Sequence, residues 1–167
     1  LFARQPGFLE PEPRRNETLA LLDQGLEAIS ASRARFAWGV PFPKPLSDGE
    51  TQTTYVWFDA LPNYWTAQFF AGSGASWPAS VHVVGKDITR FHTVIWPAML
   101  MAADLPLPER VWGHGFISLG GERFSKSAGV KLELSDAIAR FGADAFRYYL
   151  LRDIPFDGDG SFSWERF

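Results

Sequence analysis

A lysine between two serines is the pattern in this sequence that most directly indicates chemistry. The run RFSKS spans Arg123–Ser127 and places Ser125 and Ser127 on either side of Lys126. The flanking glycines predict a loop that can swing, and a mobile lysine suits phosphoryl transfer because phosphate charge develops in the transition state. The alternative is a surface hairpin with an ordinary solvated lysine, which the composition of the run favours when it is taken alone.

A second candidate group lies in TYVWFDALPNY, where a β-branched and aromatic run changes into a helical pattern. Trp57 and Tyr64 could wall a pocket for an unbranched apolar side chain, with the tyrosine hydroxyl group as a polar rim. Ala60 and Leu61 belong to the same turn. The alternative for the two aromatic residues is an ordinary place in the core, and we expect Asp59 to cap the following helix.

A third group follows the apolar run SVHVV. Gly85 allows a ligand to approach the backbone closely, and Asp87 could accept hydrogen bonds from the two hydroxyl groups of a ribose or could simply cap a helix. His92 shares a helix face with Ile88 and Trp96 at a spacing of four residues. A histidine between apolar neighbours is often a satisfied core residue, so the core and ligand readings of His92 stay equally open.

A fourth group surrounds a histidine with glycines in the run WGHGFISL. Gly113 and Gly115 leave the backbone bare on both sides of His114. Main-chain groups there could contact a flat ring, and the run leads directly into the lysine loop. The alternative is again a plain surface hairpin.

These groups all follow segments that are predicted to be strands. We expect strands at 53–58, 80–85 and 110–119, and we expect helices at 17–29, at 59–72 and from Lys86 onward, the last with a kink at Pro97. Residues 47–52 form a polar turn between two strands, and two more helices follow the lysine loop with Gly142 between them. Strands that alternate with crossover helices predict an α/β fold with a parallel sheet. Such sheets bind ligands at the carboxyl ends of their strands, where the candidate groups lie.

The composition sets limits on the kind of protein. The chain has 167 residues, of which 46% are hydrophobic and 16% aromatic, and this predicts a packed globular interior. The net charge of -3 provides no overall basic field for nucleic acid. The absence of cysteine excludes disulfides and, with only three histidines, predicts no metal site and no structural zinc. Without an apolar run that could span a bilayer we expect no membrane partner and a cytoplasmic setting.

Several motifs, in this order along the chain, resemble one enzyme family. RFSKS resembles the Lys-Met-Ser-Lys-Ser signature of class I aminoacyl-tRNA synthetases, and ISASR with WGVPFP is similar to the segment that re-enters their catalytic domain. TYVWFDALPNY, VGKDITRFHTVIWPAML and WGHGFI are more selective and resemble bacterial methionyl-tRNA synthetases. The resemblance covers essentially the whole chain. It implies the second half of a Rossmann-like nucleotide-binding fold, as a fragment of a larger protein.

The resemblance implies a function and a role for each matched residue. The implied activity is the ATP-dependent conversion of methionine to methionyl-adenylate, assisted by Mg²⁺, and the transfer of methionine to tRNA(Met). The implied methionine pocket consists of Trp57, Ala60, Leu61, Tyr64, Ile88, His92 and Trp96. The implied ATP contacts are Gly85, Asp87, His114, Gly115, Ile117 and Lys126. Lys126 is implied to stabilise the transition state in which pyrophosphate leaves, within a catalytic loop that also holds Arg123, Ser125 and Ser127.

Two departures from the family pattern limit the expectation. Arg123 and Phe124 stand where the signature has lysine and methionine, so we expect a shifted resting position of the loop with its chemistry retained. The His-Ile-Gly-His motif, the first half of the nucleotide fold and the anticodon-binding domain are absent from the 167 residues, so we expect this fragment alone to be inactive.

The resemblance also divides the chain. Residues 1–52 correspond to the segment that re-enters the catalytic domain, 53–152 to the second half of that domain, and 153–167 to the start of the connection to the anticodon-binding domain. One alternative is a truncated, synthetase-related protein that binds a ligand or partner without aminoacylation. Another is a synthetase for leucine, isoleucine, valine or cysteine, although cysteine recognition would be expected to need a zinc site that this chain has no thiols to form.

Overall fold

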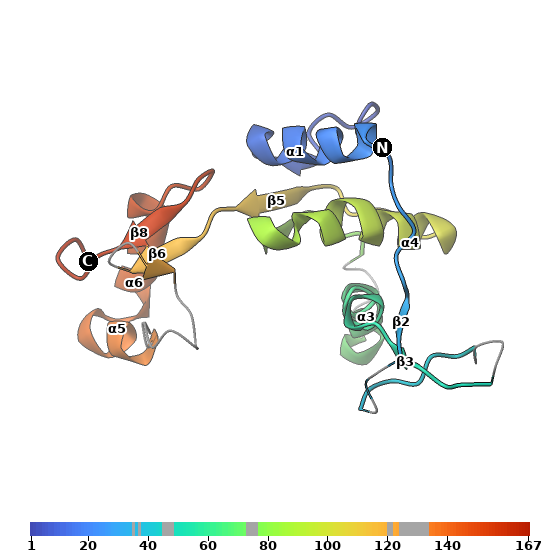
Figure 1. Cartoon of the computed structure of the whole chain (residues 1–167). Helices are drawn as coiled ribbons and strands as arrows, with labels where there is room; N and C mark the ends of the chain where they lie inside the picture. The colour runs from blue at the N-terminus through green and yellow to red at the C-terminus, as the bar shows by residue number, and fades with distance from the viewer. Residues whose placement is uncertain (35, 37, 45–48, 73–76, 120–121, 124–133) are drawn as a thin grey trace. The chain divides into compact units, whose positions relative to one another are not determined.

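The chain folds into two compact units, which are described separately. The computed structural model describes residues 1–34, 36, 38–44, 49–72, 77–119, 122–123 and 134–167 (Figure 1). Unit 1 comprises Leu1–His82 and Arg90–Val111, and unit 2 comprises Val83–Thr89 and Trp112–Phe167. Two strands, β4 (His82–Gly85) and β5 (Val111–His114), each begin in unit 1 and end in unit 2.

Unit 1 is built mainly from helices. Its described elements are β1 (Leu9–Glu10), α1 (Glu12–Asp23), β2 (Ser32–Arg33), β3 (Thr53–Thr54), α2 (Val56–Ala60), α3 (Asn63–Ala71), the π-helical segment η3 (Phe91–Ile95) and α4 (Trp96–Ala102). Strands β2 and β3 form an antiparallel pair, with Ser32 opposite Thr54. Its hydrophobic core has Leu61, Trp96 and Leu100 at the centre, surrounded by further aromatic and aliphatic residues of α2, α3, η3 and α4.

Unit 2 combines a small sheet with two helices. Its described elements are the 3₁₀ turn η2 (Lys86–Ile88), β6 (Ile117–Leu119), β7 (Glu122–Arg123), α5 (Leu134–Phe141), α6 (Ala143–Asp153) and β8 (Gly160–Phe162). Strand β6 pairs with β7 in antiparallel and with β8 in parallel orientation. The core contains the buried residues Ala137, Phe146, Tyr149 and Phe162, against which Ile117 and Leu119 of β6 also pack.

The expected α/β fold is confirmed, with a more complex strand pattern than a single parallel sheet. One three-stranded sheet has the order β1-β5-β4, and another has the order β7-β6-β8. The predicted strand at 110–119 is divided into β5 and β6 by Gly115 and Phe116. The two helices after the lysine loop are present as predicted, and Gly142 between them adopts a positive φ of 85°. Among the described residues no helix has the length and apolar character needed to cross a membrane.

The first helix lies further towards the N-terminus than its apolar spacing predicts. It starts at Glu12, after Pro11, and Pro13 occupies its first turn, where a missing N–H group has no effect on the helix. It ends at Asp23, and Gly25 has a positive φ of 87°, which stops the helix. The predicted end at Ile29 was therefore wrong, and both Leu26 and Ile29 are exposed.

The predicted strand at 53–58 was correct only in its first two residues. β3 ends at Thr54, and the backbone becomes helical from Val56. Trp57 of α2, Leu61 after it and Tyr64 of α3 all pack in the core of unit 1, and this packing outweighs the strand preference of the local sequence. Asp59 does not cap a helix as expected, because it lies inside α2, whose N-cap is Tyr55.

The helix expected from Lys86 forms as three successive segments. A 3₁₀ turn occupies Lys86–Ile88, and a π-helical segment at Phe91–Ile95 leads into α4. The Trp96 N–H group donates to the carbonyl group of Phe91, five residues back. Pro97 cannot donate a backbone hydrogen bond, which favours this wider turn immediately before it. The predicted kink is therefore realised as a change from π- to α-helix.

Candidate active site

The predicted amino-acid site forms a cluster of aromatic rings in unit 1. Leu61 and Trp96 are 1% and 2% exposed, and both belong to the buried core that Trp57 and Tyr64 line. Trp57 stacks on Phe91 with ring centroids 4.0 Å apart, and its ring meets His92 edge to face at 6.1 Å. Residues from separate helical segments thus meet in one cluster, and all of these side chains except Phe91 were predicted pocket residues.

A hydrogen bond connects the two sides of this cluster. The Tyr64 hydroxyl oxygen lies 2.9 Å from Nε2 of His92, and His92 is only 1% exposed. Burial raises the pKa of Tyr64, so its hydroxyl group is protonated at neutral pH. Tyr64 therefore carries no charge in this pair. The tautomer of His92 determines whether the tyrosine hydroxyl group or Nε2 of His92 donates the hydrogen bond.

The π-helical segment determines how His92 enters the cluster. His92 lies within Phe91–Ile95, where the chain turns more widely than in an α-helix. Such segments occur frequently at functional sites because they shift the direction of the side chains that follow. Both His92 and its neighbour Thr93 are buried, while Arg90 before them is exposed.

His82 belongs to the cluster although the sequence analysis did not select it. Its ring centroid lies 4.4 Å from that of Tyr64 and 5.9 Å from that of His92. Burial and the nearby His92 lower the pKa of His82 to about 4, so it is neutral at physiological pH. The signal for it was the alternation of strand β4, in which an inward position carries histidine while its two valine neighbours face outward.

The two remaining predicted pocket residues are Ala60 and Ile88. Ala60 is the last residue of α2 and is half-buried, and its carbonyl group accepts a hydrogen bond from the Asn63 side chain. Ile88 lies in η2 and belongs to unit 2, whereas the ring cluster belongs to unit 1.

The predicted nucleotide contacts form a different kind of site in unit 2. The Asp87 carboxylate lies close to Gly85, because a Cβ atom added to this glycine would be 2.8 Å from Oδ1 of Asp87. Between them, Lys86 forms a 2.6 Å ion pair with Asp159 and lies over the ring of Phe116 at 4.8 Å. The sequence predicted that a ligand could approach the backbone at Gly85, and in the structure the Asp87 carboxylate lies close to this position.

Asp159 joins the segment around Gly85 to the start of β6. One of its carboxylate oxygens accepts the Lys86 hydrogen bond, and the other accepts the backbone N–H group of Phe116 at 2.7 Å. The neighbouring Gly115 is so tightly enclosed that an added Cβ atom would lie 2.0 Å from the carbonyl oxygen of Gly158. The requirement for glycine at 115 therefore comes from backbone packing within this unit.

The two remaining predicted nucleotide contacts lie beside Gly115. Nδ1 of His114 is 2.7 Å from the carbonyl oxygen of Gly115, so this nitrogen carries the proton and Nε2 is left as an acceptor in the neutral ring. Ile117 begins β6 and packs against the core of unit 2. Ser125, Lys126 and Ser127 lie outside the described residues, and Arg123 is described only as part of the backbone of β7.

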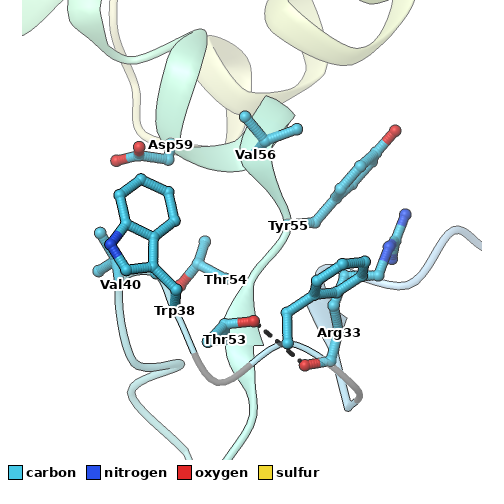
Figure 2. A pocket seen from close by; sticks show the side chains of 10 residues that line it. Arg33, Trp38, Val40, Thr53, Thr54, Tyr55, Val56 and Asp59 are labelled. Atoms are coloured by element: carbon cyan, nitrogen blue, oxygen red, sulfur yellow. Dashed lines mark hydrogen bonds between the residues drawn. The ribbon is translucent and has the colours of Figure 1, made fainter.

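A separate pocket of about 430 Å³ lies beside β2 and β3 in unit 1. Figure 2 shows Trp38 and Asp59 on one side of it and Tyr55 with Arg33 on the other. The guanidinium carbon of Arg33 lies 3.6 Å from the centroid of the Tyr55 ring, a cation–π contact. The pocket explains why Asp59 is exposed, since this side chain lines an open surface and not the ring cluster.

Comparison with known proteins defines the class to which this fold and these sites belong. The family model described as "tRNA synthetases class I (M)" matches residues 4–167, so the chain belongs to this family of class I tRNA synthetases. Its curated relatives include the methionine–tRNA ligases of Brucella suis, 46% identical over 169 residues, and Streptomyces coelicolor, 47% identical over 170 residues. These alignments cover 99% of this chain and 32% and 31% of the relatives, so the chain spans about a third of their length.

Solved structures agree with this assignment. The methionyl-tRNA synthetase of Mycobacterium tuberculosis in complex with methionyl-adenylate matches with a TM-score of 0.87 and 43% identity, over 98% of this chain and 32% of that one. The apo form of the same synthetase matches with a TM-score of 0.79 and 39% identity, over 99% of this chain and 32% of that one.

Proposed function

We propose that this chain forms part of an enzyme that activates methionine with ATP and transfers it to tRNA(Met). The observation that carries the proposal is the partly buried hydrogen bond between Tyr64 and His92 inside a cluster of aromatic rings. Membership of the synthetase family supports it, as do relatives that are methionine–tRNA ligases and a similar structure that holds methionyl-adenylate.

The ring cluster has the chemistry that a methionine side chain needs. A flexible thioether makes favourable contacts with aromatic rings, and Trp57 and Tyr64 provide such rings in unit 1. The Tyr64–His92 pair supplies polar groups without a full carboxylate or ammonium charge, which suits a neutral but polarisable sulfur atom. Branched side chains of similar size would fit less well among flat rings, which gives the proposed preference over leucine and isoleucine.

The proposed nucleotide site lies in unit 2. We place the ribose near Asp87 and the adenine ring beside the backbone of His114 and Gly115, with Ile117 next to them. An oxygen of the methionine carboxylate then attacks the α-phosphorus atom of ATP, the bond to the bridging oxygen breaks, and pyrophosphate leaves. Mg²⁺ arrives with the ATP phosphates as part of the substrate. In the second step the terminal hydroxyl group of tRNA attacks the methionyl carbonyl carbon, and AMP leaves.

Amino-acid-dependent exchange of pyrophosphate into ATP tests this function in the complete protein that contains the chain. Methionine should support exchange, while leucine and isoleucine at the same concentration should not. Exchange that leucine or isoleucine supports better would identify a different synthetase. Methionine binding without any exchange would instead support the alternative of a synthetase-related protein that does not aminoacylate.

The proposed role of the lysine loop has its own test. Lys126→Ala should lower the rate of exchange at least a hundredfold, because a cation aimed at the leaving pyrophosphate is lost. Methionine affinity should change less than threefold, since Lys126 acts in the transition state. Lys44→Ala, which removes an exposed lysine in unit 1, is the matched control and should leave both values unchanged. Equal exchange rates in the two variants would remove Lys126 from the mechanism.

A further inference from the structure

His82 is held in the ring cluster by its backbone as well as by its side chain. Its N–H group donates to the carbonyl group of Arg110 at 2.9 Å, which fixes the first residue of β4. The side chain of His82 is 6% exposed, whereas Val81 and Val83 on either side of it are 45% and 56% exposed. The strand therefore buries an imidazole ring and exposes two valines, the reverse of what hydrophobic burial alone would select.

The imidazole ring is not explained by stability. Among the described residues, no group forms a hydrogen bond with its buried Nε2 atom. A buried polar atom without a partner costs about 1–3 kcal/mol of folding free energy. An aliphatic side chain of similar size would fill this space without that cost, so the histidine must contribute something other than stability.

The contacts of the ring indicate what that contribution is. Tyr64 is its nearest aromatic neighbour, at 4.4 Å between ring centroids and with 49° between the ring planes. The ring centroid of Trp77 is further away, 6.1 Å from that of His82. Tyr64 in turn carries the hydroxyl group that is hydrogen bonded to His92. A ring anchored on a strand thus packs against the tyrosine whose hydroxyl group faces the candidate amino-acid site.

We propose that His82 is a positioning residue of the amino-acid site, which acts by holding Tyr64 in the orientation that allows its hydrogen bond to His92. The expected change in the KM for methionine rests on the proposed methionine-activating function. The expected change in the Tyr64–His92 hydrogen bond does not depend on activity. The depressed pKa of His82 supports the positioning role, because a ring that stays neutral adds no charge beside His92. Substitution of His82 should therefore weaken methionine binding without affecting the nucleotide.

The kinetic test uses His82→Leu in the complete protein. This variant should raise the KM for methionine about tenfold in pyrophosphate exchange, with kcat and the KM for ATP within threefold of wild type. Its thermal stability should be equal or higher, because the unpartnered nitrogen is removed. His82→Gln, which keeps a polar nitrogen at a similar distance from the backbone, should recover most of the methionine affinity. An unchanged methionine KM in the folded His82→Leu variant would overturn the proposal.

A double-mutant cycle tests whether His82 acts through Tyr64. If it does, the variant that combines His82→Leu with Tyr64→Phe should have a methionine KM no higher than the larger of the two single effects. If the increases in methionine KM of the two single variants multiplied in the double variant, His82 and Tyr64 would act separately. This result would overturn the proposal that His82 acts through Tyr64. Tyr148→Phe, in an exposed position of α6 in unit 2, is the control for removing a tyrosine hydroxyl group.

A spectroscopic test separates this inference from the proposed function. The ring ¹⁵N chemical shifts of His92 report its hydrogen bond to Tyr64, and they should move in His82→Leu. The signals of His114, in unit 2, are the internal reference and should stay in place. Wild-type protein without methionine-dependent exchange would contradict the proposed function alone, whereas unmoved His92 signals would contradict the positioning role.

Discussion

The two candidate sites of this chain use opposite means to hold their functional groups. In unit 1 the groups are side chains among aromatic rings, and the partly buried Tyr64–His92 hydrogen bond involves a fully buried histidine. In unit 2 the groups are backbone segments in close approach, joined by an ion pair whose Lys86 and Asp159 side chains are 25% and 55% exposed. This difference agrees with the proposed functions, a neutral side chain bound in unit 1 and a polar, charged nucleotide bound in unit 2.

The difference predicts which kind of change each unit tolerates. A ring cluster can lose one atom without a steric clash, but it responds strongly to a charge that appears inside it. A tightly packed backbone is insensitive to distant charge, but it cannot accommodate an added side-chain atom. Exposed ion pairs contribute little to either kind of site because water and salt screen them.

The largest expected effect is a steric one in unit 2. Gly115→Ala places a Cβ atom 2.0 Å from the carbonyl oxygen of Gly158 and 2.6 Å from the amide nitrogen of Asp159. We expect the local unfolding free energy of β6 and β8 to fall by about 3 kcal/mol or more, because backbone atoms cannot move aside easily. Hydrogen–deuterium exchange of these strands in the complete protein measures it.

The control for Gly115→Ala comes from unit 1. Gly7 has no atom within 4 Å of an added Cβ position, so Gly7→Ala should leave exchange unchanged. Equal protection of β6 in the two glycine variants would show that the close approach at Gly115 does not restrain the unit.

The second effect is a response of unit 1 to acid. The folded-state pKa of His82 is about 4, below its ordinary value of 6.5, so the unfolded chain binds the proton more readily. Protonation of His82 therefore has no effect on stability above about pH 6.5, and stability falls as the pH decreases from 6.5 towards 4, because the unfolded chain takes up the proton and the folded chain does not. We expect the free energy of opening of α3 and β4, as amide hydrogen exchange reports it, to be roughly 2 kcal/mol lower at pH 4.5 than at pH 7.

Hydrogen–deuterium exchange measures this acid response after correction for the intrinsic effect of pH. His82→Leu should show a smaller loss between pH 7 and pH 4.5, because it removes the titrating group while other groups still respond. If wild type and His82→Leu lost protection in parallel, the acid response would not come from His82.

The smallest expected effect concerns the ion pair of unit 2. Asp159→Asn removes the charge that faces Lys86 but keeps an oxygen that can accept the Phe116 N–H group. We expect a loss of about 0.5 kcal/mol in the protection of the Phe116 amide, and the loss should shrink in high salt. Asp159→Ala removes both contacts and should lose clearly more. Equal losses in the two variants would show that the charge, and not the backbone hydrogen bond, holds the segment.

The ring cluster was the most predictable part of the candidate site. The sequence named Trp57, Leu61 and Tyr64 because they surround the change from a predicted strand to a predicted helix, and the structure brings them into one core although Trp57 belongs to α2 and Tyr64 to α3. The two helices around Gly142 were predictable because a glycine between two helical segments favours a break. The expected strands before the nucleotide segments are present as β4 and β5, whereas the strand expected before the ring cluster ends at Thr54.

Other features could not be read from local patterns. The early start of α1 depends on Pro11 and Pro13, which the apolar spacing of later leucines obscured. The π-helical turn before Pro97 depends on which carbonyl groups find donors, and this is decided only when the helix packs. His82 was missed because the alternation of exposed and buried residues along β4, which marks its position as inward, becomes informative only once the buried face of the strand is known.

The sequence by itself determined the family, the order of the motifs and the residue types available at each candidate site. Short local runs of residues carry these properties, so they can be recognised without knowing how the chain folds. Only the tertiary structure decided that His82 packs against Tyr64, that Tyr64 reaches His92, and that Gly115 lies against Gly158. These contacts join residues that are 18 to 43 positions apart, and their formation depends on how strands and helices pack, which no local pattern encodes.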